Sequence, residues 1–324
     1  MYKSKLDIKQ TQKAIKLAKD TFEKKLIKIL NLHRVSAPIV VFKSEMINDD
    51  LGLKDSPIKF KAPNLNDQEL EIVQSLAKWK RIALLNYGYS EGEGIYTDMN
   101  ALRPKDQLDE THSLYVDQWD WELIINKEQR TLEFLHMIVK KIIHALKETK
   151  KVIRNEFSVL DEPICSEVFF ISSQDLKKMY PDKSLVEREN LITKLHKTVF
   201  INQISPLDNE SLRAPDYDDW KLNGDILIWS NILNQAIEIS SMGIRVDKNS
   251  IIQQVKLANR EELLNGNYHQ MIINQKLPLT IGGGIGQSRL CMILLEKSHI
   301  AEVQASVWSE EEKLKFKKNN LQIL

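Results

Sequence analysis

The octapeptide GGGIGQSR at residues 282–289 constrains this chain more than any other stretch, because it packs four glycines and an arginine beside apolar segments. A phosphate-binding P-loop would end in Gly-Lys-Ser/Thr, and a dinucleotide-binding turn would need a glycine at the position of Arg289. The sequence meets neither condition. We therefore expect a strand at 279–281, a glycine turn and a helix over 290–295, with a flat ligand against the glycines and Arg289 beside it. A helix entry with a buried structural arginine is the alternative interpretation.

Composition and charge narrow the classes of function. The chain has 324 residues, and 46 Lys+Arg against 45 Asp+Glu leave a formal net charge of +1. This balance gives no electrostatic footprint for nucleic acid. The longest apolar run, 290–295, is far too short to cross a bilayer, so we expect a cytoplasmic protein without membrane contact. No stretch resembles a linker, and we expect residues 1–324 to form a single domain.

Thiol and histidine chemistry are not indicated by the sequence. The cysteines, Cys165 and Cys291, lie in apolar surroundings without CxxC or Cys/His metal spacing, which predicts reduced core residues. The seven histidines also lack metal-ligand spacing, and we expect them to be structural.

Hydrophobic periodicity predicts an α+β fold with a mainly antiparallel, six- to eight-stranded sheet flanked by helices. Apolar residues at helical spacing predict helices over 7–30, 128–151 and 184–197. The expected strands are 35–42, 94–102, 114–125, 166–172, 198–202, 224–229, 236–241 and 279–281. Short polar turns between several of them are typical of antiparallel pairing.

One expected strand, YVDQWDWE at 115–122, has two contrasting faces. Alternation places the side chains of Gln118, Asp120 and Glu122 on one face and those of Asp117, Trp119 and Trp121 on the other. A central strand with a polar face usually lines a cavity, which favours a binding site here. A solvent-exposed sheet face is the alternative.

Two further strands each carry one carboxylate among apolar neighbours, Asp225 and Glu238. Two facing carboxylates are tolerated mainly when a cation or a proton lies between them. Magnesium prefers oxygen ligands and keeps phosphate oxygens and waters, so two carboxylates would suffice beside a nucleotide. A surface hairpin with both carboxylates in solvent is the alternative.

Two charged clusters match the charges of an amino acid. RAPDYDDW at 213–220 gathers three carboxylates, and SLAKWKR at 75–81 gathers three cations. A site built from both could bind one ammonium and one or two carboxylates, although each cluster alone could be a solvated surface. Arg103, before a proline at the end of a strand, fits a phosphate clamp or an ordinary surface arginine.

Taken in order, these segments resemble the three signature motifs of class II aminoacyl-tRNA synthetase catalytic cores. Within that superfamily they look like the ammonia-dependent asparagine synthetases, also called aspartate–ammonia ligases. The resemblance spans residues 1 to about 308 and rests on SLAKWKR (75–81), EGEGIYTDMNALRP (91–104), HSLYVDQWDWE (112–122), RAPDYDDW (213–220), LNGDILIW (222–229), SSMGIRVD (240–247) and TIGGGIGQSRL (280–290).

The resemblance implies a single catalytic domain over 1–324, a homodimer, and ATP and Mg²⁺ as cofactors. It implies that ATP activates the side-chain carboxylate of aspartate to β-aspartyl-AMP, releasing pyrophosphate, and that ammonia then displaces AMP. The residues it assigns to catalysis are Asp49, Lys80, Arg103 and Arg289, and those for aspartate are Lys80, Gln118, Asp120, Asp218, Ser241 and Arg245. It assigns Arg103, Glu122, Asp225, Glu238, Gly284, Gly286 and Arg289 to the nucleotide and its metal, with Asp225 and Glu238 as the magnesium ligands.

Within these assignments, Arg103 would hold the α-phosphate, Arg289 would stack on adenine, and Asp49 would face the β-carboxyl group and the incoming ammonia. We expect ammonia rather than glutamine as nitrogen donor, because Tyr2, not a cysteine, follows the initiator methionine.

Two loops depart from the family pattern. The family has a Gly-rich loop where this chain has residues 202–212, and a longer insertion between Trp220 and Asn223. Two alternatives therefore stand beside an active ligase: a paralogue related to class II tRNA synthetases, and a catalytically silent binding module.

Overall fold

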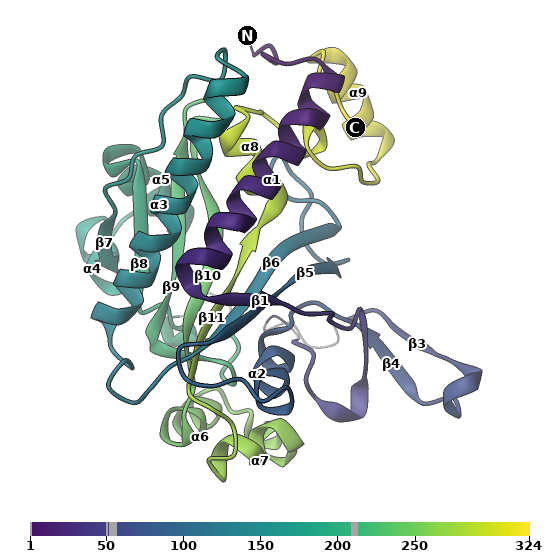
Figure 1. Ribbon diagram of the computed structural model, residues 1–324, viewed down its shortest axis with the longest axis vertical. Helices are drawn as coiled ribbons and strands as arrows, with labels where there is room; N and C mark the ends of the chain where they lie inside the picture. The colour runs from purple at the N-terminus through teal and green to yellow at the C-terminus, as the bar shows by residue number, and fades with distance from the viewer. Residues whose placement is uncertain (1, 50, 52–56, 209–212) are drawn as a thin grey trace.

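The computed structural model describes residues 2–49, 51, 57–208 and 213–324, and its centre is an eight-stranded sheet (Figure 1). The strand order is β1-β5-β6-β11-β10-β9-β8-β7. The strands are β1 (Leu32–Arg34), β5 (Gly94–Leu102), β6 (Tyr115–Ile124), β7 (Phe169–Ser172), β8 (Thr198–Asn202), β9 (Asp218–Ser230), β10 (Gln235–Arg245) and β11 (Thr280–Gly286). Neighbours from β5 through β8 are antiparallel, whereas the edge pairs β1/β5 and β7/β8 are parallel. The expected mainly antiparallel α+β sheet is confirmed.

Long helices cover the apolar face of this sheet. Helices α1 (Ile8–Leu30) and α3 (Leu132–Glu156) pack on each other and lie across the front of Figure 1, with α8 (Gln287–Leu294) beside them. Helix α1 begins at a capping box in which Asp7 and Gln10 each accept from the other's backbone N–H. Trp119 and Trp121 point into the core beneath these helices, as the alternation of β6 predicts.

The polar face of the sheet is covered by shorter elements. Helix α2 (Ala77–Asn86) contacts β5, β6 and β11, and α6 (Lys248–Leu257) and α7 (Asn267–Ile273) lie at the lower end of Figure 1. Helices α4 (Ser173–Met179) and α5 (Leu185–His196) flank β7 and β8. A small sheet of β2 (Val40–Phe42), β4 (Glu69–Ile72) and β3 (Lys59–Lys61) forms an arm at the lower right of Figure 1, and α9 (Glu310–Lys318) lies near the N-terminus.

Three expected elements differ from the structure. The predicted glycine turn is wrong, because Gly282, Gly283 and Gly284 lie inside β11 and only Gly286 caps α8. The predicted strand 35–42 is reduced to β2, since the segment that contains Pro38 is not extended into the sheet. Residues 75–81, a charge cluster without a predicted secondary structure, run into α2.

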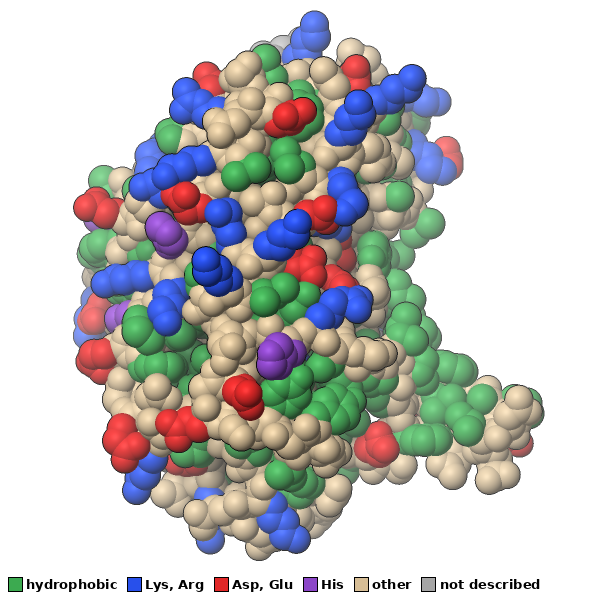
Figure 2. Space-filling model, viewed as in Figure 1, with side chains coloured by type: hydrophobic (Ala, Val, Ile, Leu, Met, Phe, Trp, Pro, Cys, Tyr) green, Lys and Arg blue, Asp and Glu red, His purple; other side chains and the backbone are tan. Residues whose placement is uncertain are grey.

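The surface carries both signs of charge. Lys and Arg side chains are more numerous than Asp and Glu side chains over the face formed by α1 and α3, where acidic residues are interspersed among them (Figure 2). No helix in the described part of the chain combines the length and apolar character needed to cross a membrane.

Candidate active site

On the polar face of the sheet, β11 carries no side chain from Gly282 to Gly286, between the charged strands β6 and β10. Gly282 pairs with Glu122 of β6 on one side and with Gly243 of β10 on the other. A Cβ atom on Gly282 would lie 2.0 Å from Glu122 Oε2 and 2.6 Å from Arg245 Nη2. The missing side chain therefore lets residues from β6 and β10 meet above β11, which explains why glycine occurs inside a strand.

Arg245 is the centre of the buried network above β11. Its Nε and Nη2 atoms donate to the two carboxylate oxygens of Glu122 at 2.9 and 2.8 Å, and its Nη1 donates to Asp218 at 2.5 Å. All three side chains are almost fully buried. Burial alone would raise the pKa of Glu122, but the cations of Arg245 and Lys80 outweigh that effect and lower it. Burial raises the pKa of Asp218, and Arg245 offsets that rise only in part.

Lys80 reaches the same network from α2. Its ammonium donates to a carboxylate oxygen of Asp120 and, at 2.9 Å, to the carbonyl oxygen of Trp121, and it lies 3.6 Å from Glu122. Cations from α2 and β10 thus lie against the carboxylates on the polar face of β6, close enough to bind the ammonium and carboxylate groups of an amino acid.

The two charged clusters predicted from the sequence do meet. Lys78 Nζ lies 2.5 Å from Asp216 Oδ2, which also accepts from His269 Nε2 at 2.8 Å, and all three residues are buried. Burial lowers the pKa of Lys78 less than the carboxylates of Asp216 and Asp49 raise it. Asp49, Lys78 and Asp216 line a cavity of about 360 Å³ between the arm, α2 and the segment before β9.

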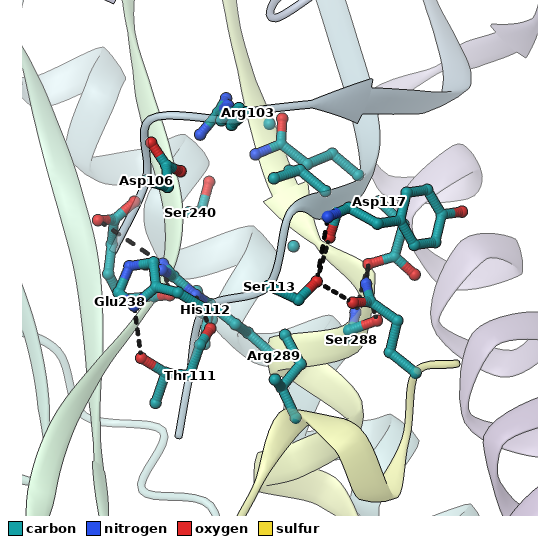
Figure 3. Close-up of a pocket in the computed structure, with 18 residues that line it drawn as sticks. Arg103, Asp106, Thr111, His112, Ser113, Asp117, Glu238, Ser240, Ser288 and Arg289 are labelled. Carbon is teal, nitrogen blue, oxygen red and sulfur yellow. Dashed lines mark hydrogen bonds and ion pairs between the residues drawn. The ribbon is translucent and has the colours of Figure 1, made fainter. Parts of the chain in front are cut away.

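A second cavity, of about 180 Å³, lies at the other end of the polar face (Figure 3). Arg103, Gln118, Glu238 and Arg289 line it together with Gly284 and Gly286. The Nε atom of Arg103 and the hydroxyl of Ser240 are buried and have no hydrogen-bond partner among the described residues. A buried donor without a partner is costly, so these atoms favour a polar ligand in this cavity.

Arg289 reaches this cavity from the first turns of α8. Its Nη1 donates to the carbonyl oxygen of Glu238 at 3.0 Å, its Nε donates to that of Thr111 at 3.2 Å, and its Nη2 lies 2.5 Å from Nε2 of His112. The guanidinium is therefore held from both β10 and the connection between β5 and β6.

Carboxylates gather next to the second cavity. Asp225 and Glu238 lie on the same face of the β9/β10 pair but are not directly opposite, because Asp225 pairs with Ser241 and Glu238 with Leu227. Arg213 Nη1 donates to Ser241 at 2.7 Å, and its Nη2 forms an ion pair with Asp225. No three His, Cys, Asp or Glu side chains of the described segments converge as a ready metal site.

The carboxylates clustered beside the second cavity have shifted pKa values. Burial raises the pKa of Asp225, an effect that Arg213 opposes and Glu238 reinforces. Burial and repulsion from Asp225 and Glu238 raise the pKa of Glu189, on α5, to about 8. Glu189 had no signal in the sequence, since only the fold brings α5 to β9 and β10.

The structure thus divides the predicted site residues into neighbouring groups. Lys80, Asp120, Glu122, Asp218 and Arg245 form the buried network, and none of these five residues lines either described cavity. The second cavity is lined by Arg103, Gln118, Glu238, Gly284, Gly286 and Arg289. Asp49 lines the first cavity, and Asp225 and Ser241 lie beside Arg213. Residues 209–212 of the loop that departs from the family pattern lie outside the described residues.

Two side chains differ from their sequence-based interpretation. Cys291 is buried as expected, but Cys165 is half-exposed, because it lies in the loop before β7 and not in the core. His112, which was expected to be structural, lines the second cavity beside Arg289.

Comparison with known proteins agrees with this geometry. The family pattern of aspartate-ammonia ligase matches residues 9–320. An aspartate–ammonia ligase of Clostridium tetani is 53% identical over 314 residues, which covers 96% of this chain and 92% of the relative. One from Lactiplantibacillus plantarum is 50% identical over 311 residues, or 95% of this chain and 97% of the relative.

Solved structures share the fold at low sequence identity. Asparaginyl-tRNA synthetase from Pyrococcus horikoshii, complexed with asparaginyl-adenylate, has a TM-score of 0.70 and 15% identity, covering 92% of this chain and 70% of that chain. This likeness confirms the expected class II synthetase-like core. Because the family pattern and relatives about half identical both extend over nearly the whole sequence, the chain belongs to the aspartate–ammonia ligase family.

Proposed function

We propose that this chain makes asparagine from aspartate, ammonia and ATP through β-aspartyl-AMP, releasing AMP and pyrophosphate. The observation that carries the proposal is the cavity that Arg103 and Arg289 both line (Figure 3). Gln118, which also lines this cavity, lies on the same face of β6 as the buried Asp120 and Glu122. At one end of this face, Arg103 and Arg289 can bind phosphates. At the other end, the ion pairs of Lys80 and Arg245 can bind the charged groups of an amino acid.

Aspartate would exchange its own charges for those already paired in the network. Its ammonium would take a place near Asp120 and Asp218, and its carboxylates would be bound by Lys80 and Arg245. Each of these groups is held by a partner on another element, so the binding geometry exists before the substrate arrives.

Activation requires the β-carboxylate oxygen to attack the α-phosphorus while the bond to pyrophosphate breaks. Arg103, with its buried unpaired Nε, would hold the α-phosphate, and Arg289 would lie against adenine. Two fixed guanidinium groups stabilise charge as it moves onto the leaving phosphates. Positioning then supplies much of the remaining rate enhancement.

Asparagine forms when the lone pair of neutral ammonia attacks the activated carbonyl carbon, AMP leaves and the nitrogen loses a proton. Asp49, buried beside Lys78 and Asp216, would face the β-carboxyl group and accept a hydrogen bond from the nitrogen. Because ammonium has no free lone pair, the rate of this step rises with pH above neutrality.

Magnesium fits the residues beside the nucleotide cavity. Asp225 Oδ1 is buried without a hydrogen-bond partner in the described structure, and Asp225, Glu238 and Glu189 repel one another. Asp225 and Glu238 would be the ligands, since carboxylate oxygens are what Mg²⁺ prefers. Bound there, the ion would neutralise phosphate charge.

We also propose a cytoplasmic homodimer. The arm exposes Ile39, Phe60 and Leu65, with exposed fractions of 59%, 40% and 42%, which supports burial of apolar surface against a second copy. Sedimentation of the full chain tests this, and a monomer at micromolar concentration would contradict it.

The reaction is tested with purified protein, ATP, magnesium and aspartate, with either ammonium or glutamine as nitrogen donor. We expect asparagine and AMP in equal amounts with ammonium and neither with glutamine. Neither a silent binding module nor a tRNA synthetase relative would form asparagine under these conditions. Efficient use of glutamine would contradict the proposed nitrogen donor.

A further inference from the structure

We propose that His112, held by Asp109, is a positioning residue that orients Arg289 toward the nucleotide. The inference rests on the proposed role of Arg289 at ATP and adds a second layer of residues behind it. His112 belongs to the connection between β5 and β6, which also carries Arg103.

The contacts form a chain from Asp109 through His112 to Arg289 (Figure 3 draws His112 and Arg289). His112 Nδ1 lies 2.8 and 2.9 Å from the two carboxylate oxygens of Asp109, and His112 Nε2 lies 2.5 Å from Arg289 Nη2. Asp109 is itself fixed, since the backbone N–H and the hydroxyl of Thr111 donate to Oδ1 at 2.7 and 3.0 Å. Backbone and carboxylate contacts therefore define the plane of the imidazole.

The partners dictate which nitrogen carries the proton. An arginine guanidinium can only donate, so His112 Nε2 must accept from Arg289. The imidazole is then neutral, and its Nδ1–H donates to Asp109. The carboxylate selects this tautomer because it only accepts when ionised. Burial would raise the pKa of the Asp109 carboxyl group, but the hydrogen bonds from His112 and Thr111 outweigh that effect and lower it to about 2.

The contacts link the helix that carries Arg289 to the connection that carries Arg103. Arg289 comes from α8, whereas Arg103 and His112 both come from the connection between β5 and β6, so the contact between His112 and Arg289 holds Arg289 against the segment that also carries Arg103. Neutral His112 adds no charge of its own to the cavity. It gives Arg289 a lateral acceptor and leaves the face of the guanidinium free for a planar base.

Substitutions separate this role from a general structural one. We expect His112→Ala to weaken ATP binding about tenfold, the usual size for a lost hydrogen bond to a charged group, and to leave the KM for aspartate unchanged. In His112→Gln the amide oxygen occupies the place of Nε2 and should restore affinity to near the wild-type value. In His112→Asn the amide lies where Nδ1 was and should not restore it.

Asp109→Asn tests the tautomer. The amide can donate to Nδ1, which would move the imidazole proton to Nε2 and point it at Arg289. We expect ATP affinity to fall as in His112→Ala, and ¹⁵N NMR of the imidazole to change from the Nδ1–H to the Nε2–H form. His144→Gln, on the exposed face of α3, is the matched control and should change neither.

Calorimetry measures ATP affinity and NMR measures the tautomer, both without turnover, so they test this inference even if no asparagine forms. Absence of asparagine would refute the proposed function alone. The inference is overturned if His112→Ala and His112→Asn bind ATP like the wild type, if aspartate and ATP binding weaken equally in both, or if the wild-type imidazole is the Nε2–H form.

Discussion

Replacing Gly282 by alanine probes the central geometric feature of the site. The added Cβ would lie 2.0 Å from Glu122 Oε2, 2.6 Å from Arg245 Nη2 and 2.6 Å from the carbonyl oxygen of Trp121. Contacts under 3.0 Å require something to move. The carbonyl of Trp121 belongs to β6, which is paired with β11, so it cannot move without disturbing the ladder.

Two responses to the extra methyl group differ in cost. Shifting the strands to make room is overpacking, at about 1–3 kcal/mol. Separating Glu122 from Arg245 would break a buried ion pair, at about 3–5 kcal/mol. Because shifting the strands costs less free energy than separating the ion pair, we expect the strands to shift. Gly282→Ala should then lower the free energy of unfolding by about 1–3 kcal/mol. Displacing Arg245 by about 1 Å should still reduce kcat/KM for aspartate about 100-fold.

Denaturant unfolding and steady-state kinetics measure these two effects. Gly286→Ala is the matched control, because its Cβ would meet nothing closer than the Arg289 Cβ at 3.6 Å, an ordinary contact. Its unfolding free energy should stay within about 0.5 kcal/mol of the wild type. If Gly282→Ala matches the wild type in both stability and aspartate kinetics, the meeting of Glu122 and Arg245 above β11 is not what the site depends on.

Further predictions concern single groups. Asp225→Asn should abolish pyrophosphate release with the fold intact by circular dichroism, and activity that is unchanged at limiting magnesium would refute a ligand role. Glu122 has a lowered pKa in the fold, so its ionised form stabilises the protein above its ordinary value of 4.5, and this stabilisation is lost as pH falls through the folded pKa. Glu122→Gln should therefore cost about 3–5 kcal/mol at neutral pH, and the difference from wild type in denaturant melts should shrink below pH 4.5; a constant difference would be contrary evidence. Burial raises the pKa of the Cys291 thiol to about 12, so a thiol reagent should modify half-exposed Cys165 in native protein and Cys291 only after unfolding; rapid, ATP-protected inactivation would contradict this.

Local patterns in the sequence predicted those parts of the fold that depend on one strand or helix. The alternation in β6 identified both the tryptophans of the core and the polar face with Gln118, Asp120 and Glu122. The prediction of a turn at the β11 glycines is wrong, because glycine occurs both in turns and inside strands where a Cβ atom would collide with a neighbour. In Gly282 the backbone is ordinary strand, and what matters is the absent Cβ, which becomes visible only when β6 and β10 are in position.

Other features depend on partners that are distant in the sequence. The cations of residues 75–81 look like a solvated surface, yet Lys78 and Lys80 are buried because carboxylates from β6 and the segment before β9 neutralise them. The partner of His112 is 177 positions away. No spacing rule within one segment could identify such a pair, although family resemblance had already indicated Arg289.

The most direct test of the proposed chemistry follows oxygen from aspartate to AMP. If the β-carboxylate attacks the α-phosphorus and ammonia then displaces AMP, the oxygen that bridges carbon and phosphorus leaves with AMP. Aspartate labelled with ¹⁸O in its β-carboxylate should therefore yield AMP carrying one labelled oxygen, unlabelled pyrophosphate, and asparagine that keeps the other label. Labelled inorganic phosphate together with ADP, or AMP without label, would contradict the β-aspartyl-AMP route.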